Sequence, residues 1–100
     1  MATKAEMITK NTETAVGLIG EENWTKIEGR ISDLLSDAIH YQKHNVLQEE
    51  FIRNIFHEMW WTQEVSSEFG NDLNDDDYHL LADCVYQSVK SQVEDAYKKK

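Results

Sequence analysis

The sequence predicts an all-α protein: a small antiparallel bundle of about four helices in one domain, residues 1–100. Proline, which interrupts helices, is absent from the sequence. Apolar residues recur at steps of three and four in four stretches, and no strand-like alternation persists. An apolar content of 40% in 100 residues is enough for one core.

The first expected helix spans residues 4–19. Its apolar face consists of Ala5, Ile8, Ala15 and Ile19, with Thr12 filling the gap. Gly17 and Gly20 predict its end, because glycine is common just past a helix. This stripe is the sparsest of the four, so the first helix is the least certain. Two alternatives are that it lies across the others or that it swaps into a second subunit.

The second expected helix, residues 23–44, has the most regular pattern. Leu35 widens a stripe that consists of Trp24, Ile27, Ile31, Leu34, Ala38 and Tyr41. Charged residues fall toward the other side. The pattern therefore predicts a long helix with one face in the core.

A turn near residues 44–45 is expected to separate the second helix from a third, residues 46–67. Asn45 and Gln48 have the spacing of a capping box at a helix start. The stripe of this helix is Phe51, Ile52, Ile55, Phe56 and Met59. One continuous helix over residues 23–67 remains the alternative.

Residues 70–77 are expected to form a loop, because they are rich in Gly, Asn and Asp. Asn74 or Asp75 would then cap the fourth helix, and aspartates in its first turn would complement the helix dipole. The stripe of that helix comprises Tyr78, Leu81, Ala82, Val85, Val89, Val93 and Ala96. Joined by short connections, the four amphipathic segments predict an antiparallel bundle.

The formal net charge of −9 excludes several classes of function. We expect no direct binding to nucleic acid, which requires a basic patch, and no binding to an anionic membrane. Cys84 is the single cysteine, so there is no intrachain disulfide. Because the chain has neither a secretory signal pattern nor a run of about 20 apolar residues, a cytoplasmic protein is expected.

The negative charge is concentrated between residues 45 and 77, which carry −8 of the total −9. One interpretation is a solvated face that keeps the protein soluble. The other is a docking surface for a basic partner, because carboxylates on a rigid helix imitate phosphates. The candidate charged contacts are Glu49, Glu50, Glu58, Glu64, Glu68, Asp72, Asp75, Asp76 and Asp77.

Two adjacent tryptophans in the third helix cannot share one stripe. Trp60 lies at the edge of the main stripe, and Trp61 points nearly opposite, on the side of Leu47 and Val65. Either the helix is buried on two sides or this second apolar strip meets another chain. Trp61 and Leu80, which is also off its main stripe, are the candidate apolar anchors.

Residues with catalytic or metal-binding potential form no complete site. Asp37, His40 and His44 share one helical face at spacings suited to a metal, yet no fourth ligand is evident, so this is a weak candidate. Cys84 flanks an apolar stripe and is expected to be a buried hydrophobe. We therefore expect no enzyme activity and no cofactor.

These observations predict a non-enzymatic, acidic protein-binding module. Its partner would be a basic protein surface, and the most specific version is an inhibitor that mimics nucleic acid on a nucleic-acid-handling protein. Viruses deploy small acidic inhibitors of this kind, which is an analogy of charge and size alone. The alternative is an assembly subunit that forms a homodimer through the second apolar strip.

Overall fold

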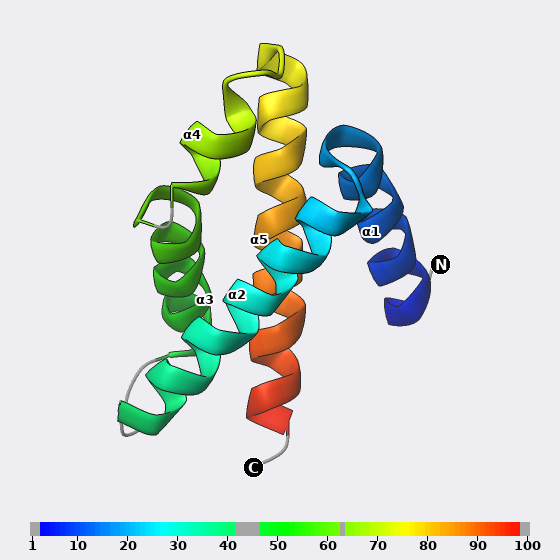
Figure 1. Ribbon diagram of the computed structural model, residues 1–100. Helices are drawn as coiled ribbons and strands as arrows, with labels where there is room; N and C mark the ends of the chain where they lie inside the picture. Colours follow the sequence, from blue (N-terminus) through cyan, green and yellow to red (C-terminus); the bar gives the residue numbers. More distant parts are fainter. Residues whose placement is uncertain (1–2, 42–46, 63, 99–100) are drawn as a thin grey trace.

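The computed structural model describes residues 3–41, 47–62 and 64–98, which form helices and turns without a strand. The all-α prediction is therefore confirmed (Figure 1). The elements are α1 (Lys4–Ile19), α2 (Glu21–Tyr41), α3 (Gln48–His57), the π-helical turn η1 (Glu58–Thr62), α4 (Val65–Gly70) and α5 (Asp75–Lys98).

Helix α1 has the predicted bounds, and a single residue connects it to α2. The Thr3 hydroxyl accepts a hydrogen bond from the Glu6 backbone N–H and caps the start. At the other end Gly20 has a φ of 92°, and its N–H donates to the Val16 carbonyl at 2.8 Å. A positive φ is inexpensive only for glycine, so Gly20 ends the helix and turns the chain. Helix α2 then begins at Glu21, two residues earlier than predicted.

The prediction of a single third helix over residues 46–67 is wrong, because α3, η1 and the start of α4 occupy this region. Helix α3 begins at Gln48, and its N-cap residue is Leu47, which makes no side-chain capping hydrogen bond. The cap was predicted at Asn45, which lies outside the described residues. The π-turn η1 follows, and then Glu64 adopts a left-handed conformation with a φ of 61°. That conformation cannot continue a right-handed helix, so α4 starts anew at Val65.

One continuous helix over residues 23–67 is also wrong, because α2 and α3 run in opposite directions (Figure 1). The predicted loop over residues 70–77 is shorter in the structure. Gly70 ends α4, and α5 already begins at Asp75. The Asn74 side-chain oxygen accepts a hydrogen bond from the Asp77 backbone N–H at 2.8 Å, so Asn74 is the cap.

Helix α5 is the centre of the molecule and contacts α1, α2, α3 and α4. Figure 1 shows α3 and α1 on opposite sides of α5, with α2 crossing obliquely. Helix α1 packs on α5 of its own chain, where the Asn11 side-chain amide donates to the Cys84 carbonyl at 3.1 Å. Helix α3 therefore forms one outer side of the molecule and α1 forms the other.

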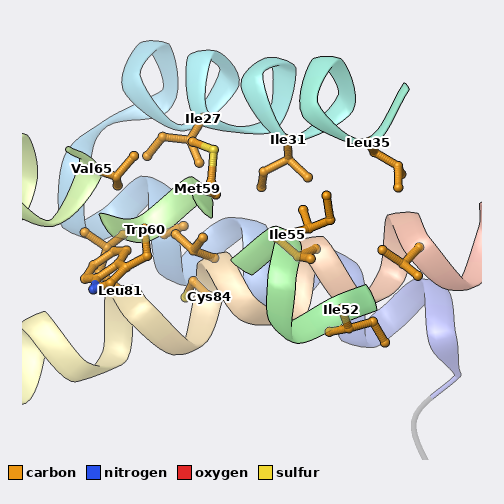
Figure 2. Close-up of a cluster of buried hydrophobic side chains, with 14 of the residues drawn as sticks. Ile27, Ile31, Leu35, Ile52, Ile55, Met59, Trp60, Val65, Leu81 and Cys84 are labelled. Carbon is orange, nitrogen blue, oxygen red and sulfur yellow. The ribbon is translucent and has the colours of Figure 1, made fainter. Parts of the chain in front are cut away.

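Most of the core consists of residues from the predicted stripes, and other stripe residues are only partly buried: Ile19, Leu34, Ala38, Phe56, Tyr78, Ala82 and Ala96. Figure 2 shows Ile27, Ile31 and Leu35 pointing from α2 toward Ile55 and Met59. Leu35 is buried and Leu34 is only half-buried, although the spacing placed Leu34 in the main stripe. Ile8 was expected to face the core but is 41% exposed, because only the second half of α1 reaches the core, at Ala15. Each fully buried isoleucine contributes about 1.5–3 kcal/mol.

Candidate protein-binding surface

The acidic residues singled out in the sequence belong to consecutive segments of the chain, from α3 through η1, α4 and the turn after it to the first turn of α5. Figure 1 shows that these segments follow one another along one side and the top of the molecule. We call the following set the acidic surface: Glu49, Glu50, Glu58, Trp61, Glu64, Glu68, Asp72, Asp75, Asp76 and Asp77. Local chemistry explains part of the placement, because acidic side chains in the first turns of α3 and α5 complement the helix dipoles.

The carboxylates of the acidic surface are exposed, apart from the half-buried Asp77. Glu68 pairs with Arg30 of α2 at 3.6 Å, with both side chains about half exposed. Such a pair contributes little to stability. Within the described residues, Glu68 is the only member of the set in an ion pair with a basic side chain. The other carboxylates therefore keep their charge available to a partner.

The two tryptophans of η1 have different surroundings. Trp60 is buried, stacked on Phe56 and edge-on to Tyr78, at ring distances of 6.2 and 5.3 Å. Trp61 is 54% exposed and lies among the carboxylates of the acidic surface in sequence. A large exposed ring beside charges has the composition of a binding hot spot. The side of η1 that carries Trp61 is therefore not buried within the chain.

The second apolar strip predicted on the third helix is not continuous. Leu47 is 75% exposed like Trp61, but Val65 is fully buried. The left-handed Glu64 between Trp61 and Val65 changes the direction of the chain, so Val65 points into the core. A homodimer built on the strip of Leu47, Trp61 and Val65 therefore lacks one of its three members.

Leu80, the second candidate apolar anchor, lies one helical turn after Asp76 and Asp77 in α5. It is 41% exposed and lines a groove between α1, α2 and α5, which we call the α1/α5 groove. The groove has a volume of about 1370 Å³, and no residue of the acidic surface lines it. Sequence reasoning missed it, since Ile8 was expected to be buried. The signal in the sequence that could have indicated the groove is a pair of small residues in each of two helices. These are Gly29 and Ser32 in α2, and Ser88 and Ser91 in α5.

The three candidate metal ligands are described only in part. Asp37 is exposed, whereas the side chain of His40 and all of His44 lie outside what the structure describes. Elsewhere in the described part of the chain, no three His, Cys, Asp or Glu residues are grouped to hold a metal ion. Cys84 is buried, as expected, and burial raises the pKa of its thiol to about 11.

Comparison with models of protein families, with curated proteins and with solved structures finds no match. Among residues 3–41, 47–62 and 64–98, no helix is both long and apolar enough to cross a membrane. Any assignment of function therefore depends on the surfaces of this chain alone.

Proposed function

We propose that this protein is a non-enzymatic binding module whose acidic surface docks on a basic surface of a nucleic-acid-handling protein. In this role it occupies the site that nucleic acid would otherwise fill and acts as an inhibitor. The observation that carries the proposal is the series of exposed carboxylates in consecutive segments of the chain, of which only Glu68 is in an ion pair among the described residues, together with the exposed ring of Trp61 in η1.

Electrostatics and packing have separate tasks in this interaction. The carboxylates speed the encounter with a cationic surface and orient it, because complementary charge acts mainly on association rate and specificity. Trp61 supplies apolar contact area that slows dissociation, as central aromatic residues do in other interfaces. Most of these groups lie in helical segments, so their backbone is already ordered before binding.

The proposal is tested by neutralising three charges without changing side-chain shape, in the variant Glu58→Gln/Glu64→Gln/Asp72→Asn. The protein is immobilised and exposed to lysate of its native host at about 0.1 M and about 1 M salt, where the Debye length falls from about 10 to about 3 Å. We expect capture of a basic protein that high salt releases and that added DNA or RNA displaces. The triple variant should retain much less of it.

The matched control is Glu13→Gln/Asp33→Asn/Asp37→Asn, which removes three exposed charges from α1 and α2. It has the same net charge as the triple variant, so a general effect of charge would weaken both equally. Equal capture by the two variants would contradict the assignment of the acidic surface. Capture that resists both salt and nucleic acid would contradict the mimicry.

A further inference from the structure

We propose that the α1/α5 groove is a second docking site, and that its occupant is an amphipathic helix of a partner protein with lysine or arginine along its flanks. This inference goes beyond the proposed function, because the groove and the acidic surface share no residue. It depends on the size, the lining and the charge of the groove.

The size of the groove favours a peptide segment over a small molecule. Its volume of about 1370 Å³ exceeds the roughly 300–1,000 Å³ that is typical of small-molecule pockets. Its lining residues in α5 run from Leu80 to Asp95. At a rise of 1.5 Å per residue this is about 22 Å, long enough for a short peptide segment. Within this span Asn11 of α1 donates to the Cys84 carbonyl, and the Ser32 hydroxyl of α2 donates to the Gln92 side chain.

The lining favours a helix that approaches closely and buries one apolar face. A Cβ atom on Gly29 would meet nothing within 4 Å, so the α2 wall is open at this point. The exposed apolar side chains Met7, Ile8 and Leu80 also line the groove. Methionine adapts its shape to a partner, and helix-in-groove recognition uses such apolar anchors.

The charge of the groove selects a cationic occupant. Among the described residues that line it, five are acidic and two are basic: Glu6, Glu28, Asp83, Glu94 and Asp95 against Lys10 and Lys90. Partial burial raises the pKa of the Glu28 carboxyl, and a cation in the groove would offset this loss of solvation. A second copy of this chain, with a net charge of −9, does not provide that complement.

The test uses a synthetic peptide of about 16 residues, made of leucine and lysine with the leucines on one helical face. A scrambled peptide of the same composition is its control for charge. Backbone amide shifts of the labelled protein are followed by NMR as each peptide is added. We expect the amphipathic peptide to shift amides in residues 6–14, 25–32 and 80–95, and the scrambled peptide to bind much more weakly.

A matched pair of variants separates the groove from the rest of the molecule. Gly29→Phe places a ring in the open space and should weaken peptide binding about tenfold or more, because the ring takes the place of the apolar anchors. Gly29→Ala adds only a methyl group and should leave binding unchanged. Circular dichroism should show the same helix content in both variants.

Four results would overturn the inference: shifts confined to residues 47–77, equal affinity for the scrambled peptide, equal binding by Gly29→Phe and Gly29→Ala, or a dimer in sedimentation that Gly29→Phe dissociates. The last result would assign the groove to a second copy of the chain. Failure here is distinguishable from failure of the proposed function, because Gly29→Phe leaves the acidic surface unchanged and Glu58→Gln/Glu64→Gln/Asp72→Asn leaves the groove unchanged.

Discussion

The pKa of the Cys84 thiol depends on where this residue lies, on the central helix α5 at the place where α1 packs. Its backbone carbonyl accepts the Asn11 amide, and its side chain is only 2% exposed. Desolvation, and then the negative charge of neighbouring Asp83, raise the pKa of the thiol from 9.0 to about 11. The reactive thiolate is therefore scarce at neutral pH, which agrees with a structural role.

The raised pKa of Cys84 predicts a loss of stability in alkali. The unfolded chain releases the thiol proton near pH 9, whereas the folded protein retains it until about pH 11. Deprotonation therefore favours the unfolded state, and the free energy of unfolding should fall as the pH rises through this window. Tyrosines and lysines titrate there too, so the measurement is the difference between wild type and Cys84→Ala in urea unfolding at pH 8 and pH 11. An equal fall in both proteins would contradict the prediction.

At the scale of elements, the most consequential feature is the break between η1 and α4. The π-turn and the left-handed Glu64 together place Met59, Trp60 and Val65 in the core while Trp61 stays exposed. A regular helix through this region would have put Trp61 and Val65 on the same side. The break thus produces the exposed ring on which the proposed binding depends.

Glu64 should carry a measurable conformational cost at this break. A left-handed conformation costs a residue with a side chain about 1–2 kcal/mol, and glycine avoids it at some cost in chain entropy. We expect Glu64→Gly to raise the free energy of unfolding by up to about 1 kcal/mol, and Glu64→Val to lower it. Glu64→Gln keeps the conformation and removes the charge, so it is the control. Urea unfolding measures all three, and a less stable Glu64→Gly variant would show that the turn is not strained.

The sequence predicted most helices because their apolar residues are evenly spaced. Ile27 and Ile31 of α2 and Val85 and Val89 of α5 all lie in the core as the spacing requires. The break at Glu64 was not predictable, since glutamate gives no signal of a positive φ. The exposure of Ile8 was missed for another reason: the spacing of residues defines a face of a helix but not how much of that face a neighbour covers.

The candidate site was predictable in part, for similar reasons. The acidic stretch is visible in the sequence, because charge needs no fold to be counted. The sequence places Leu80 near the acidic stretch, but it does not show that Leu80 also lines the α1/α5 groove. A groove arises from the angle between helices, and the angle depends on packing that a single amphipathic pattern does not describe.

At the scale of the whole molecule, the two surfaces occupy different helices around α5. The acidic surface follows α3, η1, α4 and the start of α5, whereas the groove lies between α1, α2 and α5 (Figure 1). Both are acidic, so both favour cationic partners. No residue belongs to both, so each surface is open to independent mutation.

The same negative charge that favours a cationic partner opposes folding of the free protein. A net charge of −9 on 100 residues is self-repulsive, and salt screens that repulsion. Raising sodium chloride from about 0.01 M to about 0.15 M shortens the Debye length from about 30 to about 8 Å, so the urea midpoint of unfolding should rise. Urea is the suitable denaturant because it is uncharged and leaves the ionic strength unchanged.

The variant Glu58→Gln/Glu64→Gln/Asp72→Asn has three fewer negative charges, so its midpoint should respond less to salt than that of wild type. Salt should therefore stabilise the free protein while it weakens capture of a basic partner, two effects of opposite sign from one charge distribution. A midpoint that does not change with salt would mean that the carboxylates of the acidic surface are too far apart to repel one another. The high local density of charge on which partner binding depends would then be absent.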